Sequence, residues 1–463
     1  TDPLIQHRVA EMLAEMGINV VTDDMARNQD IAIEDVHFLS QWAYPNRILK
    51  AAQWCAAQDE QEQFVQMTSF GCGPDAFLTD EVRDLLLRHE KALTLLKLDD
   101  INNVGSMKLR VRSLTESLKL AKERKRKKEH LDFHTTPVYD KTYRNRKILI
   151  PFFESYISPL IPSVLRTAGY EGENLPLSDE QSCDWGLKYA NNEVCYPATL
   201  IVGDIIKAFK SGKYSPARCA VAITQTGGQC RASNYLPLIK KALVDAGYAD
   251  VPVISLTLGG SVGNHQPGFK INWVQLLPVA LRAILYSDCI NKFYHASAVR
   301  EKERGQAKQL TDLYLRKGQE LIERGRSKEL LSRIAAAADD FNRICETKEL
   351  PKVGVVGEIF LKFNPFAQKN ITDWLIEQKI EVAPPILTDF FMQSFVNRET
   401  KLKTYLKKKE FSDTLMKHAY RLVWAQVKKI NEAASQFRYF MPFGDIFTEA
   451  QEAEKVITLN AQF

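Results

Sequence analysis

Short apolar runs recur along the chain, and several of them follow a helical pattern that ends at a glycine. Residues 8–16 have apolar positions at helical spacing and stop at Gly17, and residues 18–22 are predicted to form a strand after it. The same order of helix, turn and β-branched run recurs at 238–258 and at 371–383. Further strands are predicted at 66–70, 93–98, 147–153, 220–224 and 353–356.

Near-continuous apolar strands that alternate with helices are typical of parallel sheets covered on both faces. We therefore predict an α/β fold built of doubly wound parallel sheets, of the Rossmann or flavodoxin-like kind. Residues 288–350 and 401–434 have helical spacing and no strand signal, so we expect additional helical segments there.

The domain organisation is predicted from the same patterns. A basic run at 122–129 has no aromatic residues among its charges, which favours a solvated helix end between domains over a nucleic-acid patch. We divide the chain into an α/β domain at 1–118, a basic and polar linker at 119–146, a second α/β domain at 147–287, a helical segment at 288–350, and an α/β unit with C-terminal helices at 351–463.

Composition is that of an ordinary globular protein, with 45% hydrophobic and 26% charged residues in a chain of 463. The 62 Lys and Arg barely outnumber the 57 Asp and Glu, so wholesale binding of nucleic acid is not expected. There is no run of about 18 apolar residues and no signal-peptide pattern, which predicts a cytoplasmic protein that does not bind a membrane. The chain begins inside an amphipathic pattern without an initiator Met, so we expect a fragment of a longer polypeptide.

Candidate chemistry centres on three of the eight cysteines, each of which lies in a turn with glycine or proline. No two cysteines have the C-x-x-C spacing of a zinc or redox motif. Two of the three turns directly follow predicted strands, which places their cysteines at the carboxyl edge of a parallel sheet, where α/β proteins hold ligands. Those two turns are Gly71-Cys72-Gly73-Pro74 and Gly227-Gly228-Gln229-Cys230, and the third is Cys195-Tyr196-Pro197.

Glycine has a physical use beside such cysteines. Gly71, Gly73, Gly227 and Gly228 let the backbone approach a bulky ligand and leave N–H groups free to point at anionic sulfur. Thiolates surrounded by N–H donors suit an iron–sulfur cluster, although small half-buried thiols in tight turns are the alternative. Of the other cysteines, Cys183 fits either role, and the ones predicted to lie in the core are Cys55, Cys219, Cys289 and Cys345.

Motifs for other cofactors are weak in this sequence. The chain has no P-loop and no G-x-G-x-x-G fingerprint. The glycine-rich segment from Gly259 to Asn264 could hold a phosphate at a helix start, which leaves a nucleotide-binding α/β enzyme as a further interpretation. Glu193 and Glu358 are candidates for a general acid or base by position only.

Several segments, taken in order, resemble the 2-hydroxyacyl-CoA dehydratase and benzoyl-CoA reductase family, and specifically its large members related to acyl-CoA dehydratase activases. The resemblance implies that Cys72, Cys195 and Cys230 are ligands of a [4Fe-4S] or related cluster. It further implies an ATP-hydrolysing activase domain or subunit as electron donor and an acyl-CoA thioester as substrate, in a pocket that faces another domain or a second copy. The segments that carry the resemblance are 1–5, 69–75, 95–100, 192–197, 227–235 and 352–359.

The sequence departs from this family at one position that bears on the site. Ala198 stands where many relatives have another cysteine, and further ligands would lie before Thr1 and beyond Phe463, so we expect an incomplete cluster site in this chain. Two functions remain open. The first is an iron–sulfur component of a radical dehydratase or acyl-CoA reductase, which is a lyase or oxidoreductase. The second is a non-catalytic scaffold that docks an activase without acyl-CoA chemistry.

Overall fold

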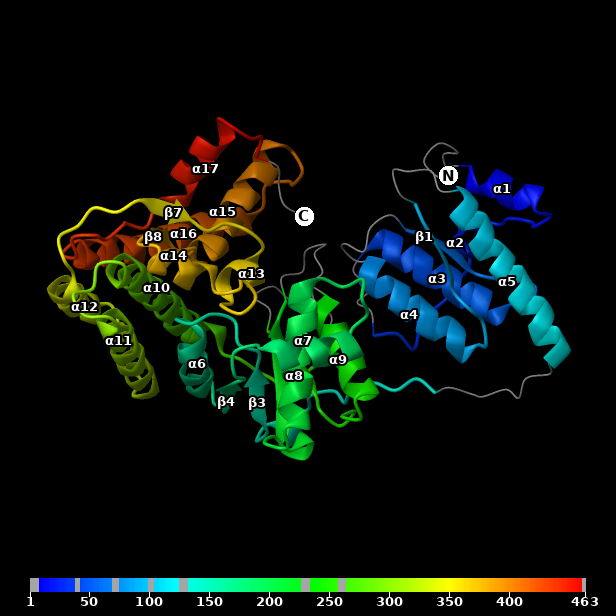
Figure 1. Cartoon of the computed structure of the whole chain (residues 1–463), viewed down its shortest axis with the longest axis horizontal. Coiled ribbons are helices and arrows are strands. Elements are labelled where there is room, and N and C mark those ends of the chain that lie inside the picture. The colour runs from blue at the N-terminus through cyan, green and yellow to red at the C-terminus, as the bar shows by residue number, and fades with distance from the viewer. Residues whose placement is uncertain are drawn as a thin grey trace. The chain divides into compact units, whose positions relative to one another are not determined.

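A computed structural model of the protein describes residues 8–37, 42–68, 75–98, 104–124, 132–225, 234–256 and 264–459 (Figure 1). The fold is mixed α/β, with helices in the majority and small sheets of parallel strands. The chain divides into two compact units, and each unit is made of three segments that are not contiguous in the sequence. Unit 1 contains Thr1–Val138, Gln181–Ala217 and Ile223–Gln266, and unit 2 contains Tyr139–Glu180, Arg218–Ala222 and Pro267–Phe463.

Unit 1 begins with helices packed on a parallel pair of strands, β1 and β2. Leu96 of β2 is fully buried in an apolar cluster with Met12 of α1 and Met107 of α5. Burial of these side chains holds both helices on the strand pair. The elements of this part are α1 (Val9–Glu15), α2 (Asp24–Arg27), α3 (Ala43–Ala57), β1 (Val65–Thr68), α4 (Asp75–Arg88), β2 (Thr94–Lys97) and α5 (Val104–Arg124).

The later part of unit 1 contains two helices whose backbones touch. A Cβ built on Gly203 would lie 1.7 Å from the carbonyl oxygen of Ser182, and one built on Gly186 would lie 2.1 Å from that of Thr199. From Ser182 to Gly186 the chain advances along α7, while the residues they contact on α8 go back from Gly203 to Thr199. The two helices therefore run antiparallel. The elements of this part are α7 (Glu180–Tyr189), α8 (Tyr196–Lys210), α9 (Tyr235–Asp245) and β6 (Val253–Leu256).

The largest sheet has four strands in the order β4-β3-β5-β6. β3 (Lys147–Ile150) lies between β4 (Gly172–Asn174) and β5 (Cys219–Thr224) and pairs with both in parallel. After β3 the chain forms β4 on one side of it, and β5 later pairs with its other side. The boundary between the two units passes through β5.

Unit 2 is mostly helical and is organised around α10 (Trp273–Ala298), which packs against α6, α11, α12, α15 and α16. Phe293 of α10 is fully buried, with ring centroids 5.5 Å from Phe341 and 5.1 Å from Phe437. In Figure 1 the helices from α10 to α17 run from green to red. The other elements are η1 (Lys141–Tyr143), η2 (Ser158–Leu160), α6 (Ile161–Thr167), η3 (Pro216–Arg218), α11 (Gln306–Glu323), η5 (Ser327–Glu329), α12 (Ser332–Ile344), β7 (Lys352–Gly354), α13 (Ile359–Phe363), α14 (Ile371–Glu377), β8 (Glu381–Ala383), α15 (Leu387–Lys403), α16 (Phe411–Ala434) and α17 (Ile446–Glu454).

Two strand assignments differ from the expectations. Residues 18–22 were expected as a strand, but they follow α1 without strand pairing, and Val20 and Val21 are 43% and 60% exposed. A β-branched run becomes a strand only where a neighbour accepts and donates its ladder of hydrogen bonds. Conversely, β4 has the sequence Gly-Glu-Asn and no apolar run, so its pairing with β3 gave no sequence signal.

The helical region also begins at a different residue from the one that the sequence pattern predicts. α10 begins at Trp273 rather than near Asp288, and Pro278 lies inside it. By length and composition alone this helix could cross a membrane, with 44% of its most apolar stretch buried in the protein. Three polar side chains on α10, those of Asp288, Lys292 and His295, are buried in unit 2. The expectation of a protein that does not bind a membrane stays a prediction.

Candidate functional site

Of the three cysteines proposed as cluster ligands, Cys195 lies in the described part of the chain. Gly71, Cys72 and Gly73 fall in segment 69–74, outside the described residues. Gly227, Gly228 and Cys230 fall in segment 226–233, which is also outside them. The described residues on either side of each segment are Thr68 and Asp75 for the first, and Gln225 and Asn234 for the second.

Cys195 is the residue that precedes α8, with extended backbone angles and with Pro197 in the first turn of the helix. The turn before it is fixed by Asn191, whose Oδ1 accepts hydrogen bonds from the N–H groups of Glu193 (2.8 Å) and Val194 (3.1 Å). The Cys195 thiol is half-buried and therefore partly open to solvent. The free N–H groups at the start of a helix favour an anionic ligand or side chain at this position.

Tyr235 ties the Cys195 thiol to the segment that contains Cys230. The Tyr235 hydroxyl lies 3.5 Å from the Sγ of Cys195. Tyr235 is buried and is the first residue of α9, five positions after Cys230.

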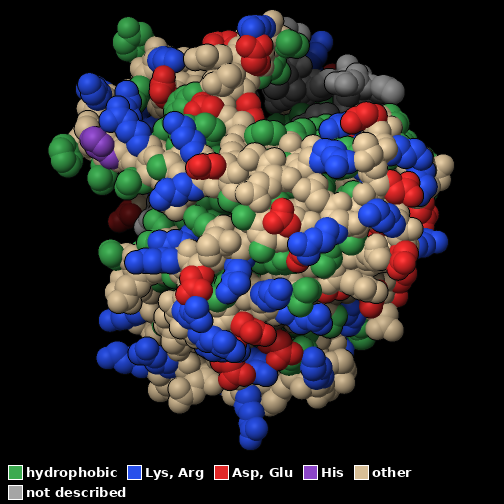
Figure 2. Space-filling view, turned by 90° about the vertical axis from the view of Figure 1, so that its left-hand side faces the viewer, with side chains coloured by type: hydrophobic (Ala, Val, Ile, Leu, Met, Phe, Trp, Pro, Cys, Tyr) green, Lys and Arg blue, Asp and Glu red, His purple; other side chains and the backbone are tan. Residues whose placement is uncertain are grey.

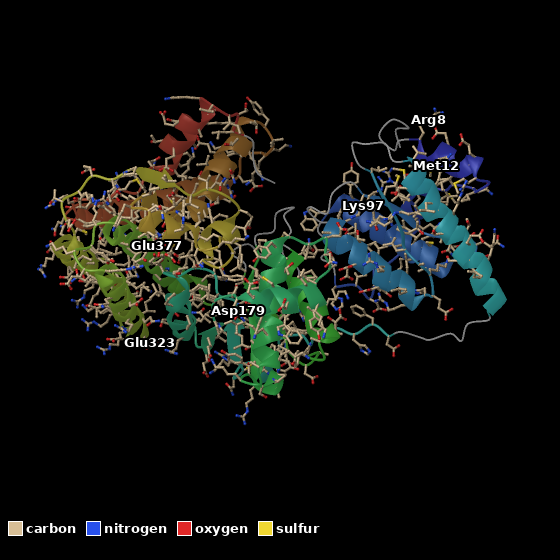
Figure 3. The ribbon with its side chains drawn as sticks, viewed as in Figure 1. Arg8, Met12, Lys97, Asp179, Glu323 and Glu377 are labelled. Atoms are coloured by element: carbon tan, nitrogen blue, oxygen red, sulfur yellow. The ribbon has the colours of Figure 1, made fainter. Side chains whose placement is uncertain are left out.

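The strand that pairs with β1, which precedes the segment containing Cys72, contacts the Cys195 turn. Lys97 ends β2 and pairs in register with Thr68, the last residue of β1 (Lys97 is labelled in Figure 3). The Lys97 Nζ lies 2.5 Å from the Oε1 of Glu193, two positions before Cys195. This ion pair is partly exposed, so it positions the turn and adds little to stability.

Asn191 makes a second connection to the same segment. Its Nδ2 donates to the carbonyl oxygen of Ala76 (2.9 Å) and to the carboxylate of Asp80, both in α4. Burial raises the pKa of Asp80, and the hydrogen bond from Asn191 partly offsets this rise. Because α4 starts at Asp75, Ala76 lies just after segment 69–74, and this flank of the segment contacts the Cys195 turn directly.

The Cys183 thiol contacts the residue that follows Cys195. Its Sγ lies 3.5 Å from the hydroxyl of Tyr196, but its helix, α7, runs antiparallel to α8. Ser182 lies against Gly203, which is eight residues along α8 from Cys195, or about 12 Å at 1.5 Å per residue. The Cys183 backbone thus lies opposite the middle of α8 while its thiol contacts Tyr196, and the two roles considered for it stay predictions. The four cysteines predicted as core are confirmed as buried, namely Cys55, Cys219, Cys289 and Cys345.

A polar network at the ends of β5 and β6 was not expected from the sequence. Gln266 donates to and accepts from the backbone of Ser255 in β6, at 2.9 and 2.8 Å. The Ser255 hydroxyl contacts Gln225, directly after β5. Lys240 of α9 donates to the Oδ1 of Asn264 at 2.8 Å, and burial lowers its pKa. The sequence signal that could have indicated this network is the polar run from Asn264 to Gln266 behind the glycine-rich segment.

Unit 2 contains a separate group of buried ionisable side chains. Asp288 of α10 accepts hydrogen bonds from the N–H groups of Leu387 (3.0 Å) and Thr388 (2.7 Å) at the start of α15. Burial raises the pKa of Asp288 to about 6 and that of Asp389 to about 7. Burial also lowers the pKa of Lys292, which lies close enough to both acids to favour their ionised forms. These groups cap and join helices of unit 2.

Among the described residues, no group of three or more His, Cys, Asp and Glu side chains has the arrangement of a metal site. No protein-family model, characterised protein or solved structure matches this chain. Evidence on function therefore comes from the resemblance of the sequence motifs and from the contacts around Cys195.

Proposed function

We propose that unit 1 holds an iron–sulfur cluster through Cys195 together with Cys72 and Cys230. In this proposal the protein is a component of a 2-hydroxyacyl-CoA dehydratase or acyl-CoA reductase system, and it accepts low-potential electrons from an ATP-hydrolysing activase. The observation that carries the proposal is that the residues flanking both other cysteine segments contact the Cys195 turn or its thiol. Lys97 and Asn191 make these contacts for one segment, and Tyr235 makes them for the other.

The donor chemistry at Cys195 fits such a group. A thiolate is the usual protein ligand of iron–sulfur clusters, and it is favoured at a helix N-terminus. The Tyr235 hydroxyl, at 3.5 Å from Sγ, can donate a hydrogen bond to a ligating sulfur and so stabilise its negative charge. A bound cluster would supply one-electron transfer. The residues of the chain would fix the thiol, exclude part of the solvent and stabilise charge.

We further propose that the four-stranded sheet is part of a doubly wound unit of the Rossmann or flavodoxin-like kind. Its strand order places β4 and β5 on opposite sides of β3, and such a reversal is the switch point at which doubly wound sheets bind ligands. The parallel pairing of β3 with both neighbours supports this topology.

The test is the iron and acid-labile sulfide content of protein purified without oxygen, with an EPR spectrum of the reduced sample. We expect several irons per chain and a reducible signal in the wild type. Cys195→Ser is expected to lose most of the iron, because serine is a poor ligand for the cluster. Cys183→Ser is the matched control, since this thiol is equally half-buried but is not one of the proposed ligands, and it should retain the iron.

Two results would contradict the proposal. Absence of iron in the wild type, even after reconstitution with iron and sulfide, would leave the scaffold function. Equal loss of iron in Cys183→Ser and Cys195→Ser would indicate non-specific binding to thiols. Binding of the cluster without binding of acyl-CoA would assign the chain to an electron relay rather than to the catalytic component.

A further inference from the structure

α16 has a second apolar face that nothing in the described part of the chain covers. Its inner face packs into unit 2 through Val427 and Ile430, which are 1% and 0% exposed. Phe411, Leu415 and Leu422 are 87%, 62% and 71% exposed. These three are separated by four and seven residues, a spacing that returns to one face of a helix and extends for about 17 Å along it.

A row of cations runs along the same helix. Lys417, Arg421 and Lys428 are again separated by four and seven residues, so they form a second row, about 120° around the helix from the stripe. They form no ion pair with any described residue. On the other side of the stripe the helix has the uncharged Ala419 and Gln426. The exposed face of α16 thus combines one apolar row with one basic row.

The end of α15 and most of α16 form a strongly basic helical hairpin. Residues 398–429 contain ten Lys and Arg but three Asp and Glu, whereas the whole chain has a net charge of only +5. The three acids are already engaged, by Arg398, Lys403 and Lys407. The remaining cations face solvent, so an anionic partner would meet no competing carboxylate from this hairpin. Figure 2 shows hydrophobic side chains next to Lys and Arg side chains on the upper part of the face it presents.

We propose that this face of α16 docks an amphipathic helix of a partner protein, with an apolar stripe flanked by acidic residues. An apolar row spaced by four and seven residues matches the seam between two packed helices, and charges beside such a seam select the partner. This inference is independent of the cluster proposed for unit 1.

Two other occupants fit less well. A second copy of the chain would bring one row of Lys and Arg against another, and like charges across a helix seam are repulsive. A helix that lies flat on an anionic bilayer has basic residues on both sides of its apolar face, whereas Ala419 and Gln426 leave one side of this stripe uncharged. An amphipathic helix with acidic residues can cover the apolar row and pair with the basic row at the same time.

The test uses the full chain and a labelled peptide of about three heptads with Leu at positions a and d and Glu at e and g. Fluorescence anisotropy measures its binding, and a peptide with Lys in place of Glu is the control ligand. We expect the acidic peptide to bind at least about tenfold more tightly than the basic one. The double variant Leu415→Glu, Leu422→Glu should weaken binding by at least about tenfold. Leu109→Glu, on α5 and 66% exposed, is the matched control and should bind as the wild type does.

A charge-reversal variant separates the basic row from the apolar row. Lys417→Glu, Arg421→Glu and Lys428→Glu together should reverse the preference so that the basic peptide binds more tightly. All substituted positions are exposed, and circular dichroism checks that each variant is folded. Lack of binding, equal binding of both peptides, or binding that the stripe variant does not change would overturn the proposal. Sedimentation onto phosphatidylserine vesicles without peptide binding would assign the face to a membrane, and self-association abolished by the stripe variant would assign it to a second copy.

Discussion

Asp389 gives a direct test of the electrostatics in unit 2, because its carboxyl group is largely buried near other acids. Burial, with Glu449 and Asp288 close by, raises its pKa from 3.8 to about 7. The folded protein therefore keeps a proton on Asp389 at pH values where the unfolded chain has already lost it. It follows that the contribution of Asp389 to stability is fully present below about pH 4 and is lost as the pH rises to about 7. At about 1.4 kcal/mol per pH unit, the loss is about 4 kcal/mol over this interval.

Asp389→Asn removes this ionisation with little change in shape. We expect the variant and the wild type to be equally stable near about pH 4, and the variant to be more stable by about 2–4 kcal/mol at about pH 7.5. Urea unfolding followed by tryptophan fluorescence gives the free energy of unfolding at each pH. Asp339→Asn, at an exposed position of α12, is the control and should show no such trend. A stability difference that does not change with pH, or a less stable variant at about pH 7.5, would refute the reasoning.

Three further predictions test the packing and the connector. Gly203→Ala should destabilise the protein by about 3 kcal/mol in urea unfolding, because its Cβ would lie 1.7 Å from the Ser182 oxygen and force α7 and α8 apart. Arg300→Met should cost about 3–5 kcal/mol in the same assay, since Arg300 is 1% exposed and its loss leaves the carboxylate of Glu381, now 2.6 Å away, without its buried partner. Replacing the lysines of 122–128 by glutamine should change the free energy of unfolding by less than about 0.5 kcal/mol, as for other solvated positions.

The strands could be predicted from the sequence where burial alone determines them. β5, with the sequence Cys-Ala-Val-Ala-Ile-Thr, is buried at five of six positions, and its apolar run indicated a strand at 220–224. Gly17 and Gly247 have φ of +72° and +84°, in agreement with the helix ends predicted at these glycines. The run at 18–22 is just as β-branched, yet it lacks a neighbour to pair with. Pairing depends on residues far along the chain, and a local pattern contains no information about them.

The same limit applies to the candidate site and to the buried charges. The glycine and proline turns indicated where the cysteines lie, but Lys97 contacts Glu193 across 96 positions of sequence, which no spacing rule could predict. Asp288 looked like one charge among many on a polar helix. It became a buried capping group only because α15, about 100 positions later, places its first N–H groups against it.

The contacts of the Cys195 turn also separate the functional interpretation from the structural one. A cysteine before a helix is, by itself, as compatible with a simple packed turn as with a ligand. A packed turn, however, needs only its own local bonds, which Asn191 already provides through Glu193 and Val194. It does not require that Asn191 also reach α4, or that Tyr235 place its hydroxyl beside the thiol. Because these additional contacts join the flanks of both other cysteine segments, Asn191→Ala should lower the iron content while Cys195 itself remains. An iron content equal to that of the wild type would mean that the turn has no part in assembling the site.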